Sequence, residues 1–248
     1  MQLHPQEILP ATGPRGQVIS AQQIGVSVNG TLAVAIAAAG AGTGEFQSNK
    51  RALAKGKIVR IYASNLTAAL TGNATHSVIP ARFNPGNGVA LGATTLIPLL
   101  ISPGLSLTSA DLIGIVKEIT ALGETEEVQL LQAPGGANQV KLAAADARPD
   151  GFWCDGSIEI ISGLGVGQKN RLTSFANGTK IALVKNIEGT SNWKVATDAT
   201  SLARIRTRRY IVNKDDLFRF VLTYAVGTGG TGTDAEVGLE IEFDDSVV

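Results

Sequence analysis

The feature of this sequence that most constrains its fold is a repeated pattern of short segments in which every second residue is apolar. Between Val237 and Phe243, for example, Val, Leu, Ile and Phe alternate with Gly and Glu. A period of two places the apolar side chains on one face of a β-strand. Asn29-Gly30 and Asn177-Gly178 separate such segments, and Asn-Gly is typical of the type I′ turns that join antiparallel strands. We therefore predict an all-β protein, sandwich-like or barrel-like, with hairpins.

The same reasoning assigns strands along most of the chain. Gln17–Ala37 is predicted to form a hairpin, Lys57–Ala63 a strand, and Ser157–Arg206 a meander of about four strands. The last strands are expected at Tyr210–Val212, Leu217–Val226 and Val237–Phe243. Glycine makes up 29 of 248 residues, well above the usual share of about 7%, which agrees with a chain that turns often.

One segment, Asp111–Gln132, fits two structures. Its apolar residues could lie on one face of a helix, with Thr108 and Asp111 as a capping pair. It could also form two strands joined around Ala121–Thr125. The β-branched residues of the segment and the internal Gly114 disfavour a helix. We therefore favour the hairpin.

Composition divides the chain into three parts. Residues 1–16 contain three prolines and two glycines, so they are predicted to be an extended arm with few internal hydrogen bonds. Residues 17–149 are predicted to be a β-rich domain. Residues 150–248 are predicted to be a β-meander module with C-terminal strands that could pack back on the first domain. The boundary follows from the linker-like stretches Pro134–Gly136 and Arg148–Gly151.

The glycines at Gly163–Gly167 look at first like a nucleotide-binding loop. A dinucleotide fingerprint requires G-x-G-x-x-G followed by a helix, but the third position here is Gln168 and short strand-like segments follow. We therefore interpret these glycines as a turn between strands, where they permit sharp bending, and expect no nucleotide to bind there.

Few residues of this sequence suit catalysis or metal binding. The two histidines, His4 and His76, are predicted to lie in the arm and in a polar loop, and neither shows the arrangement of a catalytic triad. Cys154 is the only cysteine, and the neighbouring Asp155 disfavours a thiolate, so we interpret it as a buried or half-buried structural thiol. One cysteine and two distant histidines do not suit a zinc site. We expect no enzymatic activity, no cofactor and no metal.

The charge of the chain indicates which classes of partner it is expected to bind. Lys and Arg together number 21, as do Asp and Glu, so the formal net charge is zero, and charged residues make up only 17%. A neutral chain gives no reason to expect nucleic-acid or membrane partners. A surface so poor in charge suits contacts with other subunits. The first ten residues lack the basic and apolar regions of a signal peptide.

Charged side chains nevertheless form two rows. Arg204, Arg206 and Arg208 recur with a period of two and would lie on one strand face. Glu240 and Glu242 repeat in the same way near the C-terminus. Each row could simply be a solvated face. The stronger hypothesis is that the basic row meets the acidic row, within a subunit or between subunits, and contributes orientation more than stability.

The stretch Gly156–Thr207 resembles a module common in tailed-phage virion proteins. The module has a strand pair GxIxIxSGxGxGQxRxI, then NGxTKxAxV, then an ending TxPDATSxYxI. This chain reads GSIEIISGLGVGQKNRLTSFANGTKIALVKN and VATDATSLARI at these places. Alanine replaces the module's proline before Asp198, and Arg204 stands near its tyrosine. The resemblance implies a virion structural protein and does not separate head from tail.

A second stretch, DLIGIVKEITALGETEEVQLLQ, is similar to the paired strands of small phage capsid decoration proteins, which sit on the capsid as trimers. The two resemblances together imply a capsid decoration or cement protein at the virion surface, assembled in the host cytoplasm. Its partners would be the major capsid protein and its own copies, with a homotrimer favoured. The alternatives are a tail, neck or head-fibre component, or a carbohydrate-binding adhesin that uses Trp153 or Trp193.

The predicted arm supplies further candidate contacts. Leu3, Ile8 and Leu9 are apolar, and each would contribute roughly 1.5–3 kcal/mol if fully buried on a partner. Ordering the backbone costs about 1–2 kcal/mol per residue, so the net gain per copy is small. We expect the arm to contribute to attachment and little to the stability of the isolated fold. The candidate capsid or subunit contacts are therefore Leu3, Ile8, Leu9, Arg204, Arg206 and Arg208.

Overall fold

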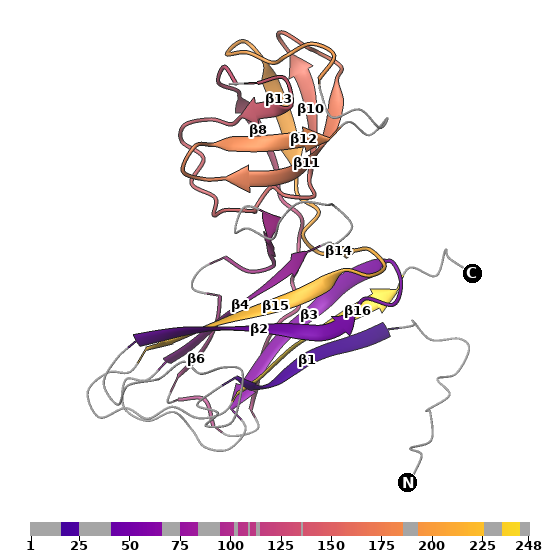
Figure 1. The fold of residues 1–248 in the computed structure, drawn as a ribbon. Coiled ribbons are helices and arrows are strands. Elements are labelled where there is room, and N and C mark those ends of the chain that lie inside the picture. Colours follow the sequence, from indigo (N-terminus) through magenta and orange to yellow (C-terminus); the bar gives the residue numbers. More distant parts are fainter. Residues whose placement is uncertain are drawn as a thin grey trace.

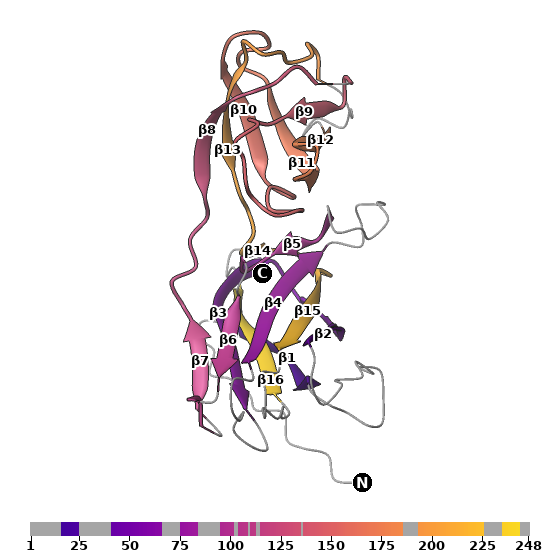
Figure 2. The ribbon, with the colours of Figure 1, turned by 90° about the vertical axis from the view of Figure 1, so that its left-hand side faces the viewer.

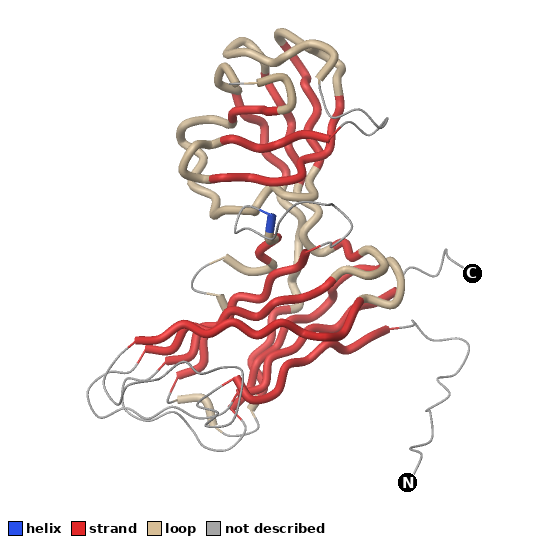
Figure 3. The backbone as a smooth tube through the Cα atoms, in the orientation of Figure 1, coloured by secondary structure: helices blue, strands red, loops and turns tan. Residues whose placement is uncertain are grey.

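The computed structural model describes residues 16–24, 41–65, 75–83, 95–101, 104–108, 110–112, 115–134, 136–185, 193–225 and 235–243. Strands and the loops between them make up nearly all of these residues (Figure 3). The predicted all-β class is confirmed. The strands form two lobes, which we call the sandwich lobe (described residues of 16–119 and 211–243) and the barrel lobe (126–206; Figure 1).

The first sheet of the sandwich lobe consists of β1 (Gly16–Ile24), β3 (Gly56–Asn65), β7 (Val116–Ile119), β14 (Ile211–Val212) and β16 (Ala235–Phe243). β3 lies in the middle: it pairs with β16 on one edge and with β14 and β7 on the other, and β1 covers the far edge of β16. Gly16, the last residue of the predicted arm, pairs with Glu242 in this sheet. The rest of the arm, with Leu3, Ile8 and Leu9, lies outside the described residues, as does the turn predicted at Asn29-Gly30.

The second sheet of the sandwich lobe consists of β2 (Ala41–Arg51), β4 (Thr75–Phe83), β5 (Ile97–Pro98), β6 (Leu105–Thr108) and β15 (Leu217–Ala225). β15 lies between β2 and β4, and the other edge of β4 pairs with β5 and β6. His76, which was predicted in a polar loop, lies on β4.

The two sheets of the sandwich lobe share one apolar core. Ile61 and Leu239 from the first sheet and Leu107 and Phe218 from the second are completely buried in the same cluster. Full burial of such a side chain contributes roughly 1.5–3 kcal/mol, so the packing of the sheets, rather than the pairing of any two strands, holds this lobe together.

The barrel lobe is a single antiparallel sheet with the strand order β8 (Glu126–Leu130), β13 (Leu202–Arg206), β10 (Ser157–Ser162), β11 (Lys169–Ala176), β12 (Ile181–Lys185) and β9 (Gln139–Lys141). The sheet curls until its last strand returns to its first, where the N–H of Gln132 donates to the carbonyl of Lys141 (2.8 Å). Its core contains the completely buried side chains of Trp153, Leu172 and Phe175. A curled sheet exposes few unpaired edges.

Asp111–Gln132 contains the two favoured strands, but they do not form a hairpin with each other. β7 pairs with β3 in the sandwich lobe, whereas β8 pairs with β13 in the barrel lobe. Leu122 is buried in the first core and Leu131 in the second. The prediction of strands was right and that of their pairing was wrong, because each half of the segment packs on a different core.

The barrel sheet also crosses the domain boundary predicted near residue 150. β8 and β9 precede this residue and β10 follows it, yet all three belong to one sheet. Gly151, one of the residues that indicated a linker, instead lies in a turn within the lobe, where its φ is 72°. After β13 the chain returns to the sandwich lobe, so the barrel is inserted between β7 and β14 (Figure 2).

Asn177-Gly178 lies in the connection between β11 and β12, as predicted, but the turn is not of type I′. Ala176 pairs with Ile181, which leaves a four-residue loop. The left-handed residue of this loop is its last, Lys180, with φ of 60°. The Lys180 ammonium donates to the side-chain oxygen of Asn177 and to the carbonyl of Asp146, each at 2.5 Å. These hydrogen bonds thus help to stabilise the left-handed backbone conformation of Lys180, which is unfavourable for a residue other than glycine.

Gly163–Gly167 forms the turn between β10 and β11, which confirms the interpretation of these glycines as a turn between strands. Gly163, Gly165 and Gly167 have φ values of 79°, 81° and 85°, which glycine adopts readily. A Cβ atom at Gly163 would lie 1.9 Å from the backbone oxygen of Thr200, whereas one at Gly167 would meet no atom within 4 Å.

We predict that Gly163→Ala lowers the free energy of unfolding by about 2–5 kcal/mol, because it adds a collision to the strain of positive φ. Gly167→Ala is the matched control and should cost only the strain, about 1–2 kcal/mol. Urea denaturation of the two variants measures both values. Equal losses would show that contact with Thr200 does not constrain this turn.

Candidate functional site at the junction of the lobes

The chain crosses between the lobes twice, and hydrogen bonds join the two crossings. The first crossing includes Glu124 and the second includes residues 207–210 (Figure 2). The Glu124 carboxylate accepts hydrogen bonds from the backbone N–H groups of Arg209 and Tyr210, both at 2.9 Å, and from the Thr207 hydroxyl at 2.6 Å. The N–H of Thr207 also donates to the carbonyl of Thr125 (2.9 Å). Hydrogen bonds therefore fix the two crossings side by side.

A completely buried arginine lies at the centre of the junction. Arg82, on β4, donates from Nη1 to Asp216 Oδ2 (2.8 Å) and from Nη2 to Asp155 Oδ2 (2.9 Å). It also donates to the carbonyls of Arg208 (2.7 Å) and Arg209 (3.3 Å). Asp216 precedes β15 of the sandwich lobe and Asp155 precedes β10 of the barrel lobe. The planar fork of one guanidinium thus connects both lobes and the second crossing.

Positive charge exceeds negative charge around Arg82. Arg171 of β11 forms an ion pair with Asp155 from the other side. Burial lowers the pKa of the Arg171 guanidinium, and the positive charges of Arg208 and Arg82 lower it further. The Arg171 guanidinium therefore lies close enough to those of Arg208 and Arg82 to be repelled by both, while Asp155 binds both Arg82 and Arg171.

Aromatic rings complete the junction. The Arg209 guanidinium lies over the ring of Phe152, 4.5 Å from its centroid, and 5.1 Å from that of Tyr210. The Tyr210 hydroxyl donates to the carbonyl of Leu99 at 2.9 Å. Phe152 belongs to the barrel core and Tyr210 to the sandwich core, so the arginine is packed between the two lobes.

Cys154 is buried in the same region. Its thiol donates to the carbonyl of Thr173 at 3.0 Å. Burial raises the pKa of this thiol to about 12, although the charges of Arg82 and Arg171 act in the opposite direction. The interpretation as a buried structural thiol is confirmed, and the cause is burial rather than the neighbouring Asp155.

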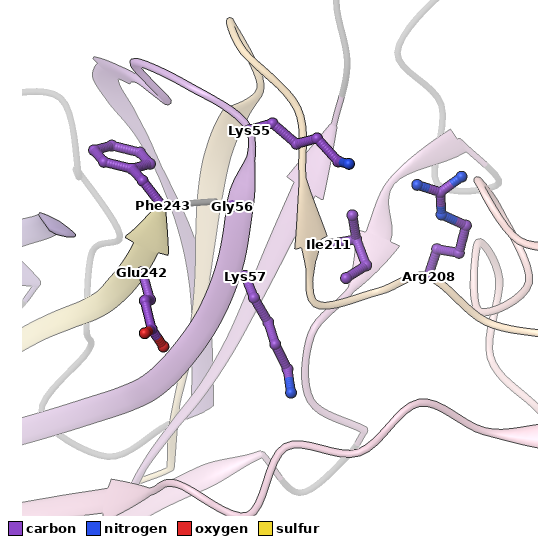
Figure 4. Close-up of a pocket in the computed structure, with 7 residues that line it drawn as sticks. All are labelled: Lys55, Gly56, Lys57, Arg208, Ile211, Glu242 and Phe243. Atoms are coloured by element: carbon purple, nitrogen blue, oxygen red, sulfur yellow. The ribbon is translucent and has the colours of Figure 1, made fainter. Parts of the chain in front are cut away.

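A pocket of about 540 Å³ opens beside the junction, where β3, β14 and β16 approach the second crossing. Figure 4 shows its lining, which consists of Lys55, Gly56, Lys57, Arg208, Ile211, Glu242 and Phe243. Its described lining contains three cationic side chains, one carboxylate and two apolar side chains. Lys55 and Arg208 point toward the space above Ile211 (Figure 4).

The predicted basic row is divided between two surroundings. Arg204 lies on the outer face of β13 and forms ion pairs with Glu126 (3.3 Å) and Glu159 (3.6 Å), and Arg206 also binds Glu126. Arg208 follows the end of β13 and lines the pocket. Within one chain the acidic partners thus lie on β8 and β10, next to β13, and not on the C-terminal strand.

Glu240 of the acidic row pairs with an arginine on the neighbouring strand. Glu240 of β16 accepts a hydrogen bond from Arg60 of β3 at 2.6 Å, and Arg60 also binds Glu118 at 2.5 Å. Arg204, Arg206 and Glu240 thus pair with directly neighbouring strands, whereas Arg208 and Glu242, one from each row, line the same pocket. Within a subunit the two rows therefore approach each other at the pocket but form no ion pair among the described residues. A meeting between subunits stays a prediction.

The two tryptophans are core residues. Trp153 is completely buried and donates from Nε1 to Asp146 Oδ2 at 2.8 Å, and Trp193 is 5% exposed. Neither offers an exposed platform for a sugar ring. Among the described residues, no group of three His, Cys, Asp or Glu side chains could hold a metal ion. No helix in that part of the chain is long and apolar enough to cross a membrane.

Comparison of the chain with protein-family models, with curated proteins and with solved structures found no match. Sequence reasoning missed Arg82, Asp155 and Asp216 as a group. The one local signal was a charged residue in the apolar context IPARF, and it does not identify partners that lie far away in the sequence.

We predict that Arg82→Met lowers the free energy of unfolding by about 3–5 kcal/mol, because Asp155 and Asp216 would stay buried after losing their shared partner. Arg60→Met is the matched control: it also removes two ion pairs, but on a partly exposed surface, and should cost about 1 kcal/mol or less. Thermal and urea unfolding measure both. Similar losses in the two variants would contradict the central role of Arg82.

We also predict that Cys154 of the native protein does not react with a maleimide at neutral or mildly alkaline pH. The thiolate is the reactive form, and a thiol with a pKa of about 12 forms almost none under these conditions. In denaturant the thiol should react at the rate of an ordinary cysteine. Mass spectrometry counts the labelled molecules, and rapid labelling without denaturant would show that the site opens.

Proposed function

We propose that this chain is a structural protein of a tailed-phage virion, and specifically a capsid decoration or cement protein that binds the outer capsid surface. The observation that carries the proposal is the place of the phage-like sequence in the fold. The stretch that resembles virion proteins supplies β10, β11, β12 and β13 of the barrel lobe, together with the turn at Gly163–Gly167. The proposed work of the protein is binding, and no catalytic step is assigned to it.

The turn at the tip of the barrel lobe offers a binding surface. Leu164 and Val166 of this turn are 45% and 63% exposed, and Val195 beside them is 45% exposed. The Gln168 side chain joins the two segments by accepting from the N–H of Val195 (3.0 Å) and donating to its carbonyl (2.9 Å). Exposed apolar side chains on a fixed backbone are typical of protein contacts. We call Leu164, Val166 and Val195 the apolar tip.

A second apolar surface lies at the opposite end of the molecule. Leu112, Ile115 and Val116 are exposed where β7 begins, at the far end of the sandwich lobe (Figure 2). The apolar tip lies where β10 ends, at the far end of the barrel lobe (Figure 1). A body with apolar surfaces at both ends and a bonded junction between them suits a protein that bridges neighbouring subunits.

We propose further that the protein acts as a homotrimer, with the major capsid protein as its partner. Low charge and the decoration-like segment support this assembly. The arm, with Leu3, Ile8 and Leu9, would extend the contact to a neighbouring subunit. A tail, neck or head-fibre protein could share these features, and copy number separates these positions. No observation favours the carbohydrate-binding alternative, because both tryptophans are buried.

The test is attachment of the purified protein to capsids that lack it, measured by co-sedimentation and quantified per capsid. We expect saturation on the order of hundreds of copies, as repeated lattice positions require. Val166→Asp should weaken attachment about tenfold, as for a contact at the centre of an interface. Leu53→Asp is the matched control: its side chain is similarly exposed, but it lies between β2 and β3 of the sandwich lobe and not in the apolar tip.

Deletion of residues 2–16 should weaken attachment while leaving the melting temperature within a few degrees. Sedimentation equilibrium of the free protein tests the trimer. Saturation at twelve copies or fewer would place the protein at a neck, vertex or tail. Failure of the full chain to bind capsids would overturn the decoration function.

A further inference from the structure

The pocket beside the junction carries an excess of positive charge. Among the described residues that line it, Lys57 and Arg208 face one carboxylate, that of Glu242, and Lys55 lies at the rim. Glu242 lies directly opposite Lys57 in the pairing of β16 with β3. Among the described residues, no carboxylate lies within ion-pair distance of the Arg208 guanidinium, whereas Arg204 and Arg206 both have such partners.

The surroundings of Arg208 add to this excess. Its backbone carbonyl accepts a hydrogen bond from Arg82, which places the residue at the edge of the buried charge cluster. The two carboxylates of that cluster already bind Arg82 and Arg171. Arg208 therefore projects a positive charge that no carboxylate in the described part of the chain pairs with, and a partly enclosed positive site attracts anions.

The shape and lining of the pocket favour a peptide over a small anion. A volume of about 540 Å³ is much larger than one phosphate or carboxylate needs, and the cationic groups are spread around it rather than gathered at one point. Ile211 supplies apolar surface between Lys57 and Arg208, and Phe243 lies at the outer edge of the lining, beside Glu242 (Figure 4). A ligand that satisfies both features carries several carboxylates and an apolar side chain.

We propose that this pocket binds an acidic peptide segment of a partner protein in which carboxylate and apolar side chains alternate. The carboxylates would bind Lys57 and Arg208, and the apolar side chain between them would pack on Ile211. Alternation of this kind is the pattern of an extended strand, whose successive side chains point to opposite sides. The proposal stands independently of capsid attachment; if both hold, the segment belongs to the neighbouring virion subunit.

The experiment is isothermal titration calorimetry of the full chain with the peptide acetyl-Asp-Leu-Asp-Leu-Asp-amide. The matched control peptide replaces each Asp with Asn and keeps length and apolar content. We expect the acidic peptide to bind measurably more tightly than the Asn peptide, and its affinity to fall as salt concentration rises.

Three variants locate the binding site. Lys57→Gln and Arg208→Gln should each weaken the acidic peptide about fivefold, the effect of one partly exposed charge pair. Lys169→Gln removes an exposed positive charge from the barrel lobe, where it pairs with Glu159 at 3.2 Å, and should leave the affinity unchanged. Circular dichroism and the melting temperature establish that each variant is folded, and the two pocket variants test the site separately.

Several results would overturn the proposal: no binding of the acidic peptide by the full chain, equal binding of the Asn peptide, or affinities unchanged in both pocket variants. Titration with inorganic phosphate is a further control. Phosphate that binds as tightly as the peptide would show that the pocket is a simple anion site. Capsid attachment of the same variants separates the two proposals. Peptide binding lost with attachment retained would mean that the pocket serves another partner.

Discussion

The arrangement of this protein depends on one buried positive charge. The Arg82 guanidinium is excluded from water, and its hydrogen bonds end on Asp216, on Asp155 and on two carbonyls of the second crossing. An unpaired ion in that position would cost several kcal/mol, so the lobes and the crossing must meet around it. A buried ion pair stabilises no more than well-packed apolar residues would, but it accepts fewer alternative arrangements. We interpret Arg82 as the residue that specifies how the lobes are oriented.

This constraint also positions the pocket that we propose as a binding site. Arg208 takes part twice: its carbonyl accepts a hydrogen bond from Arg82, and its side chain lines the basic pocket. Glu124 holds the adjacent residues of the same crossing through their N–H groups. The position of the pocket is therefore set by the buried network, and so is the separation between the apolar tip and the far end of the sandwich lobe. Binding surfaces whose geometry is fixed before contact lose less conformational entropy on association.

Patterns of neighbouring residues in the sequence correctly predicted individual strands and turns. Alternation identified the strand at Val237–Phe243, and glycine spacing identified the turn at Gly163–Gly167. These patterns did not predict strand pairing or buried ion pairs, which depend on residues far apart in the sequence. Asp111–Gln132 contains both predicted strands, but they do not pair with each other, because each half of the segment packs on a different core. Arg82 reaches partners 73 and 134 residues away, a relation that no spacing motif expresses.

The insertion of the barrel between β7 and β14 has a consequence for the order of folding during synthesis. All six barrel strands lie within residues 126–206, so this lobe can close as soon as that stretch has left the ribosome. The sandwich lobe cannot, because β15 lies between β2 and β4, and β16 lies between β1 and β3. Its two central positions are filled by the last strands to be made. Until then, the early strands present unpaired edges, and such edges are where nascent chains associate wrongly.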